Sequence, residues 1–120
     1  MKFAALDEYL RRERVRAAVS FALDEQLGMH HGISSSDFVL LQSIDEGATT
    51  VADSDLAKQL GLLRSQLLMR VRPLEKVGLV LRTTDGRGRR AVLLSAAGRR
   101  LLCEARETAA EVCQKSGAGA

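Results

Sequence analysis

Two predicted helices separated by a glycine-centred turn constrain the fold of this chain more than any other feature. The first helix reads DLAKQL, can be capped by Asp53 or Ser54, and ends at Gly61. The second follows at once as LRSQLLMRVRPLEKVG and ends at Gly78. Two helices joined by so short a turn are typical of a helix-turn-helix.

A β-hairpin is predicted directly after the second helix. LVLRTT and RRAVLL are the two strands, and the Asp85-Gly86 pair in DGRG is a turn signal. Arginines crowd this hairpin, at Arg82, Arg87, Arg89 and Arg90. Asp85 is the local acid that could pair with Arg87 and hold it in place. The mutual repulsion of these arginines is tolerable if an anionic partner such as DNA phosphate neutralises them.

The charge of the whole chain is distributed unevenly. Residues 1–60 carry 6 basic and 10 acidic side chains, a net −4, whereas residues 61–120 carry 12 basic and 5 acidic, a net +7. The last aromatic residue is Phe38, so the basic half has no ring on which an unpaired base could stack. The pattern therefore favours duplex DNA, contacted through grooves and phosphates, over single-stranded nucleic acid.

Three further helices are predicted around this region. Apolar residues recur at helical spacing from residue 3 to about 28, and another helix begins at the cap Ser34 and ends at Gly47, which we expect to be left-handed. The last helix runs from Ser95 to about Lys115. At 120 residues the chain is long enough for one domain, which we place at residues 1–115, with residues 116–120 as a disordered tail.

The helix after Gly61 has two distinct faces. Leu63, Leu67, Val71 and Leu74 fall within one arc and are predicted to face the core. The remaining residues suit DNA: the N-terminal part of such a helix usually reads bases in the major groove, and arginines further along meet phosphates. We therefore expect base contacts from Arg64, Ser65, Gln66 and Met69 and phosphate contacts from Arg70 and Arg72.

The order and content of these segments resemble the MarR family of transcription regulators. The resemblance covers residues 34 to about 104 and rests on SDFVLLQSID, SDLAKQLGLLRSQLLMRVRPLEKVGLV and RTTDGRGRRAVLLSAAGRRLL, in which Asp85 and Arg87 match the family's Asp-x-Arg wing motif. It implies a winged helix-turn-helix and a homodimer with interlocked terminal helices. Such a dimer binds a pseudo-palindromic operator and is often released by a small ligand or an oxidant.

Three features depart from the family pattern. The family usually has one more C-terminal helix, so the dimer interface here is expected to be smaller or different. Pro73 lies inside the reading helix, lacks a backbone N–H and is expected to bend the last turns. Leu63 and Leu68 stand where the family commonly has small hydroxyl residues, so the family's base contacts do not transfer whole.

Other kinds of site are weakly supported. No catalytic set or phosphate-binding loop is visible, so we expect neither an enzyme nor a cofactor. His30 and His31 are adjacent and point apart, which favours a turn role over metal binding. Cys103 and Cys113 lie about 15 Å apart along one predicted helix and are two packing side chains or, alternatively, an intersubunit redox pair. Charges interrupt every apolar stretch, so no membrane span or signal peptide is expected and the protein is predicted to be cytoplasmic.

The sequence thus predicts a mainly helical α+β protein with a small hairpin wing. Residues 1–28 and 95–115 are the expected dimerisation helices, and residues 34–94 the DNA-binding core. The predicted function is a sequence-specific, double-stranded DNA-binding regulator, a repressor responding to a small-molecule effector. The alternative is a winged-helix interaction module whose basic face meets an acidic protein.

Overall fold

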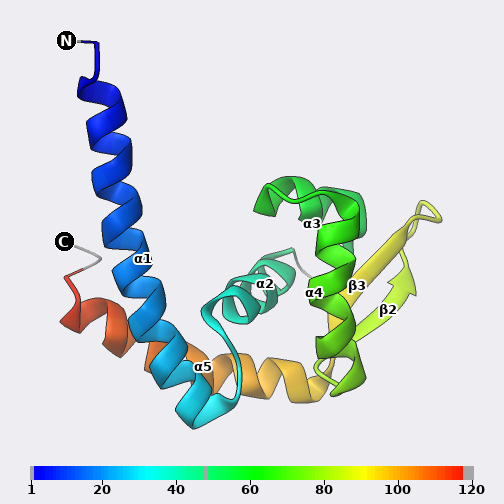
Figure 1. The fold of residues 1–120 in the computed structure, drawn as a ribbon. Coiled ribbons are helices and arrows are strands. Elements are labelled where there is room, and N and C mark those ends of the chain that lie inside the picture. The colour runs from blue at the N-terminus through cyan, green and yellow to red at the C-terminus, as the bar shows by residue number, and fades with distance from the viewer. Residues whose placement is uncertain (1, 48, 118–120) are drawn as a thin grey trace. The chain divides into compact units, whose positions relative to one another are not determined.

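Five helices and three short strands make up the computed structural model, which describes residues 2–47 and 49–117. The order is α1 (Ala4–His31), α2 (Ser35–Glu46), β1 (Val51–Ala52), α3 (Asp53–Leu60), α4 (Arg64–Lys76), β2 (Val80–Thr84), β3 (Arg90–Leu94) and α5 (Ala96–Lys115) (Figure 1). The predicted mainly helical α+β class is confirmed. Residues 118–120 of the predicted tail lie outside the described part of the chain.

The described residues divide into two compact units. One contains residues 2–35 and 105–117, and the other contains residues 36–104. The division falls inside α5, because this helix contributes its first turns to one unit and its last turns to the other. The sequence predicted this boundary, between the DNA-binding core and the C-terminal dimerisation helix, at residue 95.

The unit of residues 36–104 holds the two helices around Gly61. Gly61 has a left-handed backbone, with φ of 67°, and ends α3 where the sequence predicted. The Leu62 N–H then bonds the Ala57 carbonyl at 2.8 Å, which closes the turn before α4 begins. The core of this unit contains fully buried aliphatic side chains: Leu40, Leu41, Ile44, Leu56, Leu67, Val71, Val80 and Val92.

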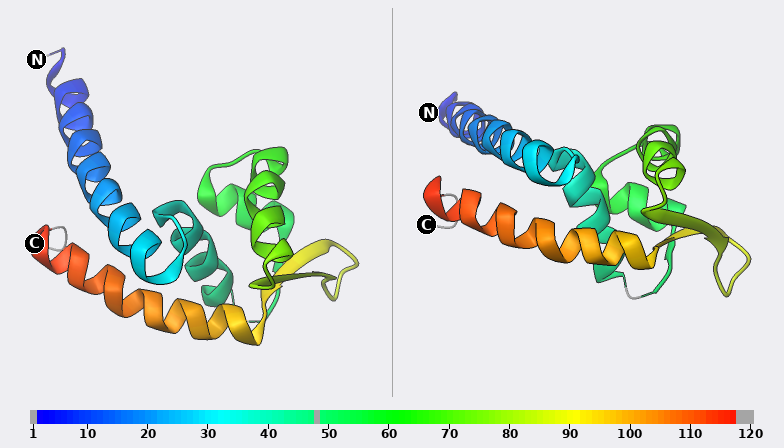
Figure 2. Two further views of the ribbon diagram at one scale, coloured as in Figure 1. Left: turned by 60° about the horizontal axis from the view of Figure 1, so that its bottom comes forward. Right: turned by 90° about the horizontal axis from the view of Figure 1, so that it is seen from below.

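The sheet of this unit has three antiparallel strands rather than the predicted two. Its order is β1-β3-β2, with Val51 opposite Val92 and Thr84 opposite Arg90, and the β2–β3 hairpin projects past α4 (Figure 2). Strand β1 was missed because its two residues pair with a strand far along the chain. The prediction that Gly47 is left-handed is wrong. The residue lies close to Val51, whose side chain a Cβ on Gly47 would hit.

Ser95 joins the base of the hairpin to the end of α4. Its hydroxyl donates to the Gly78 carbonyl at 2.6 Å and accepts from the Gly98 N–H at 2.9 Å, which caps α5. Gly98 lies directly against the Leu79 carbonyl, where any side chain would collide. These contacts fix the hairpin relative to α4, the two elements on which the predicted DNA contacts lie.

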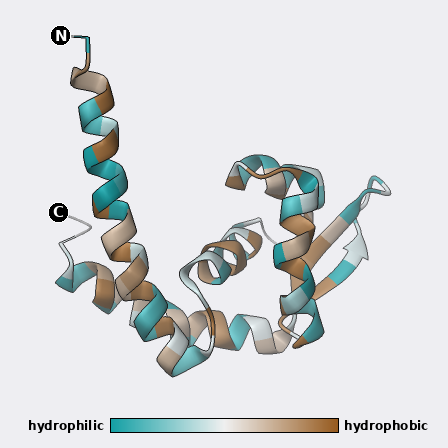
Figure 3. Cartoon of the chain, in the orientation of Figure 1, coloured by the Kyte–Doolittle hydropathy of each residue, from teal (hydrophilic) through white to brown (hydrophobic). Residues whose placement is uncertain are grey.

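The other unit consists of α1 and the last turns of α5. α1 continues through His30 and His31 and ends at Gly32, whose φ of 69° is left-handed, so the predicted turn role of the two histidines is wrong. His31 Nε2 lies 2.7 Å from the Thr108 hydroxyl oxygen of α5. Hydrophobic and charged residues alternate along α1 (Figure 3), and Leu27 is its one buried residue among those described.

Candidate nucleic-acid interface

Helix α4 presents a polar face to solvent along its whole length. Leu67, Val71 and Leu74 are buried, as predicted, and anchor the opposite side of the helix. The prediction that Leu63 joins them is wrong, because Leu63 precedes the first helical turn and the residue is 69% exposed. The outward residues include all those expected to contact DNA from this helix: Arg64, Ser65, Gln66, Met69, Arg70 and Arg72.

Gln66 has a structural role that sequence reasoning missed. Its side-chain Oε1 accepts a hydrogen bond of 2.9 Å from the Leu63 backbone N–H. This bond is the reciprocal half of a capping box; the other half is absent because a leucine side chain cannot accept a hydrogen bond. The amide nitrogen of Gln66 remains available to a base. The position of Gln66, three residues after the N-cap Leu63, is the signal in the sequence that could have revealed the cap.

Asp85 organises the tip of the hairpin. Its Oδ1 accepts from the backbone N–H groups of Arg87 and Arg89, both at 2.9 Å, and its Oδ2 accepts from the Arg89 Nε at 2.9 Å. These bonds, led by the one from the Arg89 backbone, lower the pKa of the Asp85 carboxyl. Asp85 was expected to hold the Arg87 side chain, but it holds the Arg89 side chain. The turn lies where the Asp85-Gly86 pair predicted it, and its left-handed residue is Gly88.

Two arginines of the hairpin are engaged with acids of α3. Arg82 is only 12% exposed and donates from Nη1 and Nη2 to the two carboxylate oxygens of Asp53, at 2.7 and 2.6 Å. This hydrogen-bonded pairing raises the pKa of Arg82. Arg89 Nη2 also lies 3.4 Å from Asp55 Oδ2. Arg82 therefore holds the hairpin on α3, and its predicted contact with DNA stays a prediction.

The prediction that Asp53 or Ser54 caps α3 is wrong, because both residues lie inside the helix. The capping position is Ala52, and Asp53 is the first residue inside the helix, with a side chain that is only 2% exposed. A buried carboxylate needs a partner more than a helix end needs a cap, because an unpaired buried charge is far more costly than a lost cap. Arg82, 29 residues away, supplies that partner.

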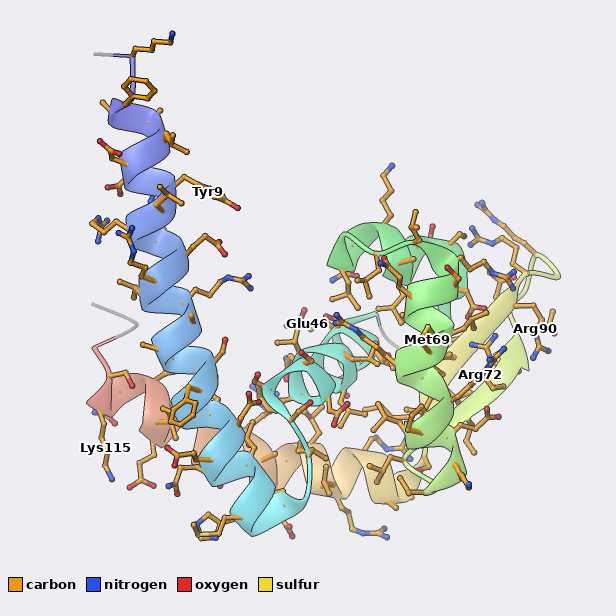
Figure 4. All side chains as sticks on the ribbon, in the orientation of Figure 1. Tyr9, Glu46, Met69, Arg72, Arg90 and Lys115 are labelled. Carbon is orange, nitrogen blue, oxygen red and sulfur yellow. The ribbon has the colours of Figure 1, made fainter. Side chains whose placement is uncertain are left out.

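The remaining arginines of α4 and the hairpin leave their charges exposed. Arg70, Arg72, Arg87 and Arg90 are exposed, and none forms an ion pair within the described part of the chain. Arg72 of α4 and Arg90 of β3 line a common hollow of about 290 Å³ between the helix and the hairpin (Figure 4). Glu75 is the one acid among the described residues that line this hollow, so helix and hairpin together present a mainly basic surface, suited to a polyanion.

A second hollow lies in the unit of α1 and the last turns of α5. Its volume is about 610 Å³, within the usual range of small-ligand pockets. Its polar lining mixes both charges and includes Glu25, Gln26, His30, His31, Glu111 and Lys115. In the same helix α5, Cys103 is exposed, Cys113 is half-buried, and both are free thiols.

Neither a metal cluster nor a membrane-spanning helix is found among the described residues. They contain no group of three or more His, Cys, Asp or Glu side chains placed to hold a metal ion. None of their helices is both long enough and apolar enough to cross a membrane.

A helix-turn-helix followed by a basic β-hairpin defines a winged helix-turn-helix protein. No protein-family profile matches the sequence, and no curated protein does. Solved structures do match. A MarR-family regulator from Rhodococcus sp. RHA1 is 28% identical, with a TM-score of 0.84 over 93% of this chain and 79% of that one.

Two further solved structures carry bound molecules. CouR from Rhodococcus jostii RHA1, bound to p-coumaroyl-CoA, is 28% identical, with a TM-score of 0.78 over 86% of this chain and 73% of that one. A cysteine-to-serine mutant of MarR from E. coli, complexed with operator DNA, is 19% identical, with a TM-score of 0.81 over 96% of this chain and 81% of that one. The chain has the MarR-like winged-helix fold of these transcriptional regulators.

Proposed function

We propose that this protein is a sequence-specific, double-stranded DNA-binding transcription regulator. The observation that carries the proposal is the basic surface of α4 and the hairpin, where Arg70, Arg72, Arg87 and Arg90 are exposed and have no ion pair among the described residues. An α-helix fits the major groove, and a basic hairpin beside it reaches phosphates or the minor groove. The MarR mutant complexed with operator DNA supports the same use of this fold.

We propose further that two copies of the chain form the DNA-binding species. α1 and the residue before it expose more large hydrophobic side chains than a solvated helix needs: Phe3, Leu6, Tyr9, Leu10, Val15, Phe21 and Met29. In α5, by contrast, Ala105, Ala109 and Val112 are already buried within a single chain. The surface to be covered by a second copy therefore lies on α1 and not equally on both helices. A two-fold dimer would place two α4 helices about 34–36 Å apart, one turn of DNA.

We propose, in addition, that a small ligand controls the binding of this protein to DNA. We expect a repressor that an effector releases from DNA, and the 610 Å³ hollow of the α1–α5 unit is the candidate site for that effector. The CouR structure bound to p-coumaroyl-CoA supports ligand control in this fold but does not name the ligand of this chain. A regulator of this kind acts in the cytoplasm, where its DNA is.

Selection of bound duplexes from a random pool tests the proposed function. We expect enrichment of a sequence with two inverted half-sites, and binding to that sequence that weakens steeply as salt rises. A protein that enriches no sequence and binds all duplexes equally weakly would instead favour an interaction module for an acidic protein. Capture of the protein by an acidic peptide of random sequence would then support that alternative. A protein that has lost its fold is expected to bind neither the duplexes nor the peptide.

A further inference from the structure

Asp53 faces arginines from two other elements of its unit. Its carboxylate is clamped by Arg82 of β2 through two hydrogen bonds, and its Oδ2 also lies 3.6 Å from Nη2 of Arg64 in α4. A carboxylate offers about four lone-pair positions, so the pairing with Arg82 leaves capacity for a second cation. One buried charge thus connects the first turn of α3, the first turn of α4 and the hairpin.

Arg64 is held less tightly than Arg82. Its side chain is 59% exposed, and the separation of 3.6 Å from Asp53 is an ion pair without a hydrogen bond. The guanidinium is therefore directed by a fixed negative charge while its N–H donors stay available to a base or a phosphate. Ordering a free side chain of this length on binding costs about two- to tenfold in affinity, and prior orientation removes part of that cost.

Building on the proposed DNA-binding function, we propose that Asp53 is a positioning residue for base recognition that acts through Arg64. Arg82 keeps the Asp53 carboxylate in place, and the carboxylate keeps Arg64 over the start of α4, where helices of this kind read bases. Partial neutralisation by Asp53 also weakens the attraction of Arg64 to any phosphate. Asp53 therefore raises the preference for the cognate sequence over random DNA although it contacts neither.

The test measures affinity for a selected duplex and for a random duplex across salt concentrations. Asp53→Asn is expected to lower the ratio of the two affinities by about tenfold, the effect of one well-placed base contact. It is also expected to steepen the log-affinity against log-salt slope on random DNA by about 1, because Arg64 then pairs with a phosphate. In an Arg64→Ala background, Asp53→Asn should change neither quantity. Asp45→Asn, the same change at an exposed position of α2, is the control for net charge.

A purely structural role would not give this pattern, since it lowers both affinities together. If Asp53→Asn alone fails to fold, judged by circular dichroism, the double variant Asp53→Asn/Arg82→Gln removes the unpaired buried charge and is measured instead. An unchanged ratio in folded protein, or the same fall with and without Arg64, overturns the proposal. A wild-type protein that prefers no sequence overturns the proposed function itself, so the two failures are distinguishable.

Discussion

The Gln66 side chain is expected to have two roles that substitutions can separate: capping helix α4 and contacting a base. Its Oε1 accepts a hydrogen bond of 2.9 Å from the Leu63 N–H, and the residue is exposed on the face that we expect in the major groove. Gln66→Ala removes both groups. Gln66→Glu keeps an acceptor at the helix start but replaces the donor by a negative charge. The two variants therefore separate the structural task from the DNA task.

The expected stability changes follow from the cap. Loss of a capping hydrogen bond at an exposed helix end costs about 1 kcal/mol. With an unfolding entropy of about 2.1 cal/mol/K per residue over 120 residues, this cost lowers Tm by about 4 °C. Gln66→Glu should melt at or above the wild-type temperature, since a carboxylate in the first turn interacts favourably with the helix dipole, worth about 0.3–1 kcal/mol. Gln59→Ala, at an exposed position of α3, is the matched control for melting.

The expected binding changes run in a different order. Gln66→Ala should cost about 1–3 kcal/mol at one base position of the selected duplex and leave random duplex binding nearly unchanged. Gln66→Glu should weaken binding to every duplex, because its carboxylate faces the phosphates and acceptor atoms of the groove. Melting followed by circular dichroism and titration by fluorescence anisotropy measure both effects. A wild-type Tm for Gln66→Ala would refute the cap, and equal losses on all sequences would refute base reading.

Three other predictions follow from the wing and from α1. Arg87→Ala should weaken binding to selected and random duplexes alike and flatten the salt slope by about 1, and unchanged affinity would remove the wing from the interface. Phe21→Glu together with Leu10→Glu should give a folded monomer with reduced operator affinity, and a wild-type chain that sediments as a monomer at micromolar concentration would contradict the dimer. Because the folded-state pKa of Asp85 lies below its ordinary value of 3.8, its contribution to stability is present above that value and is lost as pH falls through the lowered pKa; Asp85→Asn should flatten this acid-side fall, as urea unfolding at several pH values would show.

Local signals in the sequence were sufficient for most of the helix ends. Gly61 ends α3 in the left-handed conformation, and Ser95 caps α5. The two strand segments LVLRTT and RRAVLL pair to form the hairpin. These features depend on backbone preferences and on hydrogen bonds between residues close in the chain, so the sequence carries them directly. The buried face of α4 is likewise set by helical periodicity, apart from Leu63, which lies before the helix begins.

The tertiary structure alone decided how the arginines are used. From the sequence, Arg82, Arg87, Arg89 and Arg90 are all expected to meet DNA, and only Arg87 is expected to pair with an acid, Asp85. In the fold, Arg82 pairs with Asp53 and Arg89 with Asp55 and Asp85, while Arg87 and Arg90 form no ion pair among the described residues. The pairing partners on α3 lie 29 and 34 residues along the chain from their arginines, so only folding brings them together. Such a choice depends on which charges become neighbours and are buried, and burial is a property of the folded chain that no local pattern contains.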